Sequence, residues 1–180
     1  ERVMISPPDQ DIPILVFRYG KLLELNIRFL RLTHPPSMKR QSLVGRTAPG
    51  TRSLLSVDLR KPLPDLKKGT VIAFFWATWC GPCKAALPAL RAFQKTYTNR
   101  NLRILTVSNE TSRVVRAWLA QNPDSMPFHN TVDTQRDFFT KLRINATPTF
   151  VLFHNGKIIS YLVGFSHKNQ ELLRKAIENL

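Results

Sequence analysis

The sequence predicts an α/β fold with a central sheet flanked by helices, preceded by an N-terminal β-hairpin. Apolar runs typical of buried strands alternate with segments whose apolar residues recur at three- and four-residue steps, as on one face of a helix. The pair Asn155-Gly156 between two apolar runs is a strong signal for a hairpin near the C-terminus. Strands that alternate with helices in this way are typical of a layout with parallel strands.

Composition is that of an ordinary globular chain apart from its charge. The 180 residues include 43% hydrophobic and 22% charged residues, and the formal net charge is +15. Basic residues are spread along the chain without a dense block and interleaved aromatics, so no nucleic-acid site is expected. The charge is compatible with a solvated basic surface, with association to an anionic membrane surface, or with an acidic partner protein.

The N-terminal segment, residues 1–42, is predicted to be a hairpin followed by a linker. After a polar lead-in, Ile14–Phe17 is an apolar strand, Tyr19-Gly20-Lys21 is a turn, and residues 23–29 alternate between apolar and polar. An amphipathic helix over Lys21–Leu32 is the alternative. A lone hairpin is marginal in water, so we expect it to pack on the main domain, on another copy of the chain or on residues absent from it. Residues 33–49, with their Pro and Gly residues, read as the linker, with the domain boundary near residue 42.

The main domain, residues 43–180, is predicted to contain the sheet and its helices. A short strand is expected within 52–57 and a buried strand at 71–76, followed by a helix at 83–97 that bends at Pro88. The later elements expected are a strand at 102–108, a helix at 111–121, a strand at 128–132, a helix at 134–142, strands at 150–153 and 157–163, and a helix at 167–180.

The only two cysteines, Cys80 and Cys83, stand where the buried strand turns into the first helix. A helix N-terminus favours an anion, and cysteines placed there have a lowered pKa and are reactive. We therefore expect Cys80 to be the exposed attacking thiol, with a pKa below the usual value of about 8.5. Cys83, one turn further and more buried, would be the resolving thiol. Pro82 suits the first turn because its missing N–H would be unused there.

A zinc site and an inert structural disulfide are the alternatives for this pair. Zinc takes about four ligands, and the four histidines show no metal-ligand spacing to the cysteines. No metal is expected, and no cofactor other than a redox-active disulfide between Cys80 and Cys83. The pattern favours redox chemistry.

Residues 43–180 resemble the thioredoxin superfamily. The resemblance is carried by the stretch Trp76-Ala77-Thr78-Trp79-Cys80-Gly81-Pro82-Cys83, by Pro88 in the helix, and by Ala146-Thr147-Pro148-Thr149 before a strand. The insertion between Ser108 and Val132 is similar to the TlpA/ResA/CcmG branch of bacterial extracytoplasmic thiol-disulfide proteins. Further similarities to this branch are Gly45–Pro49 and the pair Pro127-Phe128 ahead of Asp133.

The resemblance implies a thioredoxin fold and an enzyme, a thiol-disulfide oxidoreductase that reduces protein disulfides and exchanges electrons with a redox partner protein. Pro148 would be a cis-proline facing the cysteines, and Thr147 would pair its backbone with a substrate strand. Trp79 would form an apolar lip over Cys80, with Gly81 and Pro82 also touching substrate. The branch further implies a role in electron transport in the bacterial periplasm. Because the chain begins at Glu1 without a methionine, we expect that a signal or a membrane anchor could precede it.

Two positions depart from the family pattern. Thioredoxins carry a buried Asp where this chain has Phe74, and the TlpA branch often carries a Glu where this chain has Ala86. Either carboxylate would accept the proton when the resolving thiol attacks. The sequence leaves Glu110, Lys84 or water as candidates for that proton in this chain.

The hairpin resembles the closing strands of a PDZ domain over about twenty residues, without the peptide-binding loop. This resemblance implies that the chain carries part of such a domain. It also keeps open a second function, a thioredoxin-fold adaptor module that is recruited through its hairpin and basic surface. Oligomerisation through the hairpin is a related possibility.

Overall fold

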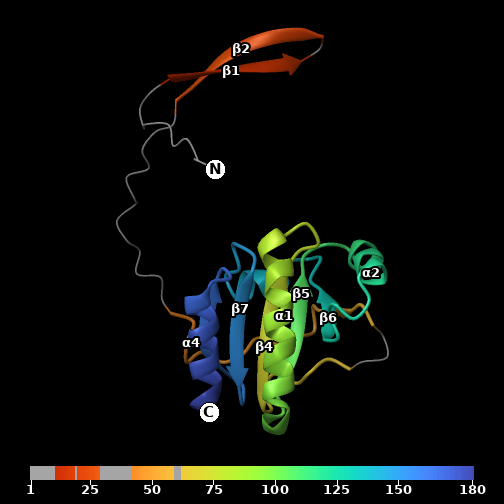
Figure 1. The fold of residues 1–180 in the computed structure, drawn as a ribbon, viewed down its shortest axis with the longest axis vertical. Helices are drawn as coiled ribbons and strands as arrows, with labels where there is room; N and C mark the ends of the chain where they lie inside the picture. Colours follow the sequence, from red (N-terminus) through yellow and green to blue (C-terminus); the bar gives the residue numbers. More distant parts are fainter. Residues whose placement is uncertain (1–10, 19, 29–41, 59–61) are drawn as a thin grey trace. The chain divides into compact units, whose positions relative to one another are not determined.

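The computed structural model divides the chain into two compact units, residues 1–41 and 42–180. It describes residues 11–18, 20–28, 42–58 and 62–180. The predicted lead-in and most of the predicted linker therefore lie outside the described residues. Each unit is considered by itself below (Figure 1).

The first unit contains an antiparallel pair of strands, β1 (Asp11–Arg18) and β2 (Lys21–Arg28). The helix considered for residues 21–32 is thus wrong over the length of β2. Leu15, Phe17 and Leu22 are 66%, 72% and 63% exposed. Phe17 pairs with Leu22 in the ladder, so these two side chains share one face of the hairpin.

The second unit is built on a six-stranded mixed sheet, as predicted. Its strands are β3 (Leu55–Ser56), β4 (Thr70–Trp76), β5 (Arg103–Ser108), β6 (His129–Val132), β7 (Thr149–His154) and β8 (Lys157–Val163). They lie in the order β3-β6-β5-β4-β7-β8. The neighbours β4, β5 and β6 are parallel, and the other pairs are antiparallel. All seven residues of β4 are buried, which explains the continuous apolar run of the central strand.

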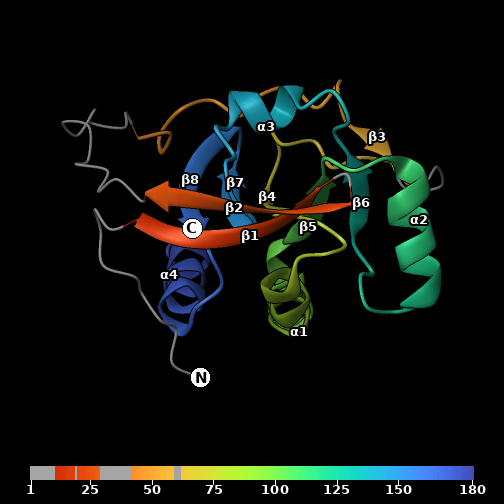
Figure 2. The same ribbon diagram turned by 90° about the horizontal axis from the view of Figure 1, so that it is seen from above.

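Helices cover both faces of this sheet. They are α1 (Gly81–Thr96), followed by the 3₁₀ turn η1 (Thr98–Arg100), α2 (Ser112–Gln121), α3 (Asp137–Lys141) and α4 (His167–Glu178). Buried residues of α1, α2 and α4 form one core with Phe74 and Trp76, whereas α3 packs with Phe75 in the core of the other face. Figure 2 shows α3 on the opposite side of the sheet from α1 and α4. No helix in the described ranges is both long and apolar enough to cross a membrane.

Two helices differ from their predicted limits. The first begins at Gly81, two residues earlier than expected, and runs through Pro88 without interruption. The helix expected over 134–142 is reduced to Asp137–Lys141. Arg136 has a left-handed backbone (φ 57°), and its amide donates to the Asp133 carbonyl, so residues 133–136 form a turn that delays the helix. The strand expected within 52–57 is limited to Leu55–Ser56.

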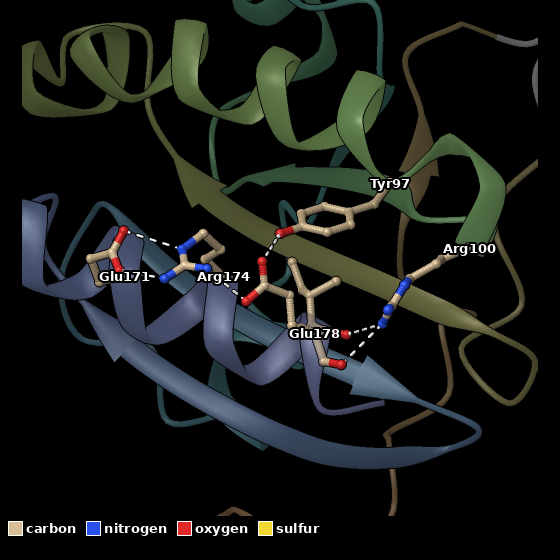
Figure 3. A network of polar contacts seen from close by, with 6 residues as sticks. Tyr97, Arg100, Glu171, Arg174 and Glu178 are labelled. Atoms are coloured by element: carbon tan, nitrogen blue, oxygen red, sulfur yellow. Dashed lines mark hydrogen bonds and ion pairs between the residues drawn. The ribbon is translucent and has the colours of Figure 1, made fainter.

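A polar network joins the C-terminal ends of α1 and α4 (Figure 3). The Tyr97 hydroxyl donates to Glu178 Oε1 at 3.0 Å, and Arg174 bridges Glu178 and Glu171. Arg100 donates to the carbonyl oxygens of Ile177 and Glu178, where the last turn of α4 lacks intrahelical partners. The network fixes the final turn of α4 against the segment that leads into β5.

This network makes stability depend on pH. Hydrogen bonds from Arg174 lower the pKa of both Glu178 and Glu171 below the ordinary value of 4.5. A carboxylate with a lowered folded-state pKa stabilises the fold above its unfolded pKa, and this stability is lost as the pH falls through the folded pKa. We expect Glu178→Gln to unfold more easily than the parent at pH 7, and the difference to vanish toward pH 3. Urea unfolding at both pH values measures this.

Asp124 offers the control, because it is exposed and has no side-chain hydrogen bond or ion pair within the described residues. Asp124→Asn should leave the pH profile unchanged. A Glu178→Gln profile that runs parallel to the parent profile between pH 3 and pH 7 would contradict the role given to the network.

Candidate active site

The cysteine pair lies at the N-terminus of α1, at the carboxyl end of the central strand. Cys80 is the N-cap residue with an extended backbone (φ −79°, ψ 101°), and its sulfur accepts a hydrogen bond from the Cys83 amide at 3.2 Å. Its own amide donates to the Ala77 carbonyl, which closes the turn between β4 and α1. Cys80 Sγ therefore sits at the positive end of the helix dipole, among amide groups that favour an anion.

Cys80 and Cys83 are joined in a disulfide, with their Cα atoms 5.2 Å apart. Cys83 is fully buried, as predicted, but Cys80 is only 3% exposed. The expectation that Cys80 is exposed is therefore wrong for this oxidised form. Its sulfur is directed at Cys83 and belongs to the core on the α1 side of the sheet, so little of it faces solvent.

The rim around the disulfide is formed by its sequence neighbours. Trp79 is 75% exposed, and Gly81 and Pro82 are also exposed. Trp76, in contrast, is 1% exposed and packs edge-on against Trp118, with ring centroids 5.0 Å apart. Of these two tryptophans, only Trp79 is thus available to a partner molecule.

Thr147 and Pro148 lie beside the end of the same central strand. The next residue, Thr149, pairs with Phe75 in the antiparallel ladder of β4 and β7, so Pro148 falls next to the turn that leads to Cys80. The Thr147–Pro148 peptide bond is cis. The Pro148 carbonyl accepts from the Gly164 amide, whereas no backbone hydrogen bond of Thr147 is found within the described residues.

The two positions at which the family carries an acid are apolar and fully buried. Phe74 packs against Phe150 with ring centroids 5.1 Å apart, and Ala86 lies one helical turn after Cys83. Ala86 also lines a hollow of about 240 Å³ between α1 and α4, which includes its solvent-open mouth. The sequence named Lys84 and Glu110 as candidates to accept the proton of Cys83. Neither has a hydrogen bond to the Cys83 sulfur within the described residues: Lys84 is exposed, and the Glu110 carboxylate is bonded to Thr78.

Glu110 anchors the loop that precedes Cys80. Its carboxylate accepts hydrogen bonds from the amide and the hydroxyl of Thr78, both at 2.7 Å, and from the Ser108 hydroxyl at 3.0 Å. This contact was not predicted from the sequence, because it follows from the register of two strands. Trp76 pairs with Ser108 at the ends of the parallel strands β4 and β5, so residues two places further on each strand meet. Glu110 therefore positions the loop that precedes Cys80.

Removal of this anchor should weaken both the fold and the reaction. Glu110→Ala leaves the Thr78 amide and hydroxyl without their acceptor, and a hydrogen bond to a charged group contributes about 2 kcal/mol. We expect a loss of about 2 kcal/mol in the free energy of unfolding and a several-fold slower reduction of a disulfide peptide. Glu110→Gln keeps one acceptor oxygen and should lose less of both. Equal behaviour of Glu110→Ala and the parent in urea unfolding and in the peptide assay would contradict the anchoring role.

Among the described residues, no three His, Cys, Asp or Glu side chains come together in a way that could hold a metal ion. What the site itself presents is a cysteine at a helix N-terminus, bonded to a buried second cysteine, beside an exposed tryptophan and a stretch of backbone at Thr147 that has no hydrogen bond within the described residues.

Comparison with known proteins agrees with this geometry. The chain is 26% identical over 137 residues to the thiol-disulfide oxidoreductase ResA of Bacillus thuringiensis, which covers 73% of this chain and 76% of that protein. It is 32% identical over 108 residues to a thioredoxin-like protein of Haemophilus influenzae, covering 60% of this chain and 58% of that protein. The predicted ResA-like branch and the predicted class, thiol-disulfide oxidoreductase, are thereby confirmed.

Solved structures agree on the fold. A crystal structure from Chlorobium tepidum, assigned as thiol:disulfide interchange protein DsbE, matches with a TM-score of 0.63 and 26% identity over 77% of this chain and 98% of that one. StoA of Bacillus subtilis matches with a TM-score of 0.55 and 23% identity over 69% of this chain and 96% of that one, a likeness that concerns the fold alone. The AhpC/TSA family model matches residues 44–162, about two thirds of the chain. The chain therefore belongs to the AhpC/TSA family of thioredoxin-like proteins.

Proposed function

We propose that this protein reduces disulfides of protein substrates, with Cys80 as the attacking thiol and Cys83 as the resolving thiol. The observation that carries the proposal is the position of the pair: Cys80 caps α1 and is within hydrogen-bond reach of the Cys83 amide, while Cys83 is fully buried. A thiolate at a helix N-terminus is stabilised and reactive. A buried thiol one turn away can reach only that first sulfur.

The reaction consists of two thiol-disulfide exchanges. The Cys80 thiolate attacks one sulfur of the substrate disulfide, the substrate S–S bond breaks, and the other substrate sulfur leaves as a thiolate. The Cys83 thiolate then attacks Cys80 Sγ, and the remaining substrate thiolate leaves. The substrate gains two electrons and, after protonation, two thiols. The protein is left with the Cys80–Cys83 disulfide, and a dithiol partner protein must reduce it again.

Substrate binding is assigned to the surface around the pair. An extended substrate segment would pair with the backbone of Thr147 by addition of a β-strand, next to Pro148. This is supported by the lack of a backbone partner for Thr147 within the described residues and by the register that places Pro148 beside the β4–α1 turn. The exposed ring of Trp79, with Gly81 and Pro82, would cover the apolar side of the substrate.

Trapping the mixed disulfide tests this proposal. Without its resolving thiol, reduced Cys83→Ser should accumulate a covalent complex with a disulfide-bonded protein substrate, and mass spectrometry should locate the bond at Cys80. Cys80→Ser is the matched control, which should form no such complex. If Cys83→Ser traps nothing, the protein is better described by the alternative, a binding module in which the disulfide only locks a loop.

We further propose that the protein is a reductant. No histidine or charge lies between the two cysteines to hold the Cys80 thiolate strongly, since the intervening residues are Gly81 and Pro82. A potential near that of thioredoxin, about −270 mV, is expected from equilibration with glutathione buffers. A value near that of the strong oxidant DsbA, about −120 mV, would reverse the direction of the reaction.

The proposal also assigns the two parts of the chain and their surroundings. Residues 43–180 would carry the reaction, and residues 1–42 would bind a partner or a second copy of the chain through the exposed Leu15, Phe17 and Leu22. The location proposed is extracytoplasmic, in electron transport, as in the branch that the chain resembles. Membrane contact through the basic charge and the origin of the hairpin in a PDZ domain stay predictions.

A further inference from the structure

Three helices, α1, α2 and α4, begin at the end of the sheet where the disulfide lies. Strands β4 and β5 are parallel, and β8 runs in the same direction because β7 is antiparallel to both β4 and β8. Helices α1, α2 and α4 follow β4, β5 and β8 in the chain, so their N-termini share the end at which Cys80 lies (Figure 1). The first turns of these helices therefore lie at the same end of the domain as the proposed site.

Each of these first turns presents a cation and none presents an acid. Lys84 of α1, Arg113 of α2 and Lys168 of α4 are exposed, and the three helices have no Asp or Glu in their first turns. No ion pair or side-chain hydrogen bond of these three residues is found within the described residues. Cations at helix N-termini oppose the helix dipole, so helix stability does not account for this arrangement. We call Lys84, Arg113 and Lys168 the basic rim.

The acids at this end of the domain are already engaged. Glu110 is bonded to Thr78 and Ser108. Asp133 is fully buried and accepts from the Phe139 amide, and Asp137 is paired with Lys141. Asp65 precedes β4, which places it at the opposite end. Neutral donors do not cancel the charge of a carboxylate, but the three cations of the basic rim outnumber Glu110 and Asp133, the two acids at this end that have no ion pair within the described residues.

We propose that the basic rim selects protein substrates that carry Asp or Glu side chains beside the disulfide to be reduced. The inference rests on the proposed function, since it needs a substrate segment bound across Cys80. A segment held there would place its flanking side chains toward the first turns of the three helices, where opposite charge speeds encounter and like charge rejects partners. Anionic lipid surfaces are typically bound by a continuous cluster of basic residues. The basic rim instead has one cation on each of three helices, an arrangement that suits a peptide segment better than a lipid surface.

The test compares three peptides with the same disulfide, flanked by Asp, Ser or Lys. The second-order rate constant for reduction by the full reduced chain is measured in 20 mM and 500 mM NaCl. We expect the Asp peptide to react about tenfold faster than the Ser peptide in low salt, the Lys peptide to react more slowly than either, and the differences to shrink in high salt because the charges are screened.

Variants then locate the effect. The triple variant Lys84→Gln/Arg113→Gln/Lys168→Gln should lower the Asp-to-Ser ratio of rate constants to about two or less. A ratio is used because Lys84 adjoins Cys83, so a change in thiol reactivity affects both peptides equally. The control Lys67→Gln/Lys95→Gln/Lys157→Gln removes the same charge from exposed residues at the opposite end of the domain and should keep the parent ratio.

The outcomes separate the two proposals. Reduction of all three peptides at similar rates overturns the basic rim and leaves the oxidoreductase intact, whereas reduction of none overturns the proposed function itself. If only the control variant loses the Asp-to-Ser ratio of rate constants, the selectivity does not come from the basic rim and the proposal is wrong. If the triple variant keeps the peptide ratio but no longer sediments with phosphatidylserine vesicles, the rim serves a membrane surface and the substrate inference is wrong.

Discussion

Reduced protein is expected to react with iodoacetamide about a hundredfold faster at Cys80 than at Cys83 near neutral pH. Cys80 is the N-cap of α1, where amide groups and the helix dipole stabilise the thiolate, which is the reactive form. Cys83 is fully buried, and the family's two acid positions near it are occupied by Phe74 and Ala86. Burial without a charged partner raises the pKa of a thiol and blocks the reagent.

The experiment follows the alkylation of each cysteine by peptide mapping over a pH range. Cys80 should show a titration below the free-thiol value of about 8.5, whereas Cys83 should react slowly at every pH at which the protein stays folded. Each single variant, Cys80→Ser and Cys83→Ser, isolates one thiol and serves as the control for cross-talk. Equal rates at the two thiols would contradict their assigned roles, even if the protein proved active.

The location of the pair follows from short-range patterns. An apolar run, a Cys-x-x-Cys and a three-four periodicity place Cys80 at a strand-to-helix turn, and the structure has it there as the N-cap of α1. The Asn155-Gly156 hairpin likewise joins β7 and β8. In both cases the information lies within a few residues of the element that it specifies.

Features that depend on distant residues were not predictable in the same way. The contact of Glu110 with Thr78 spans 32 positions and depends on the register of β4 against β5, which the sequence pattern does not contain. The late start of α3 depends on the left-handed backbone of Arg136, a residue without any preference for that conformation. The near burial of Cys80 accompanies its bond to the buried Cys83, and the sequence does not state whether the pair is oxidised.

The missing acid near Cys83 gives the second large effect, because it can be supplied. Ala86 is on the same helix as Cys83, one turn later, and residues at this spacing lie on the same face. It lines the hollow between α1 and α4, with Asn169 and Gln170 as polar neighbours across it. The hollow has room for about one water molecule, so a glutamate at this position requires the side chains around it to shift. Its burial raises its pKa toward neutrality, which suits a general base.

Ala86→Glu is therefore expected to speed the attack of Cys83 on the mixed disulfide by about a hundredfold, the lower end of the range typical of general base catalysis. The measurement starts from a mixed disulfide prepared between Cys80 and a peptide and follows peptide release in a single turnover. In the parent, release should accelerate steadily with pH as Cys83 ionises, whereas in Ala86→Glu it should depend less on pH above the pKa of the new carboxyl.

Ala86→Gln is the matched control, because glutamine has the same size and cannot accept the proton. If packing alone changes the rate, both variants will behave alike, and urea unfolding will show what the added side chain costs in stability. Faster release in Ala86→Glu but not in Ala86→Gln would show that deprotonation of Cys83 limits the parent. Equal release in the parent and Ala86→Glu would mean that the departing substrate thiolate or water already removes the proton fast enough, and that a protein of this fold can work without the buried acid.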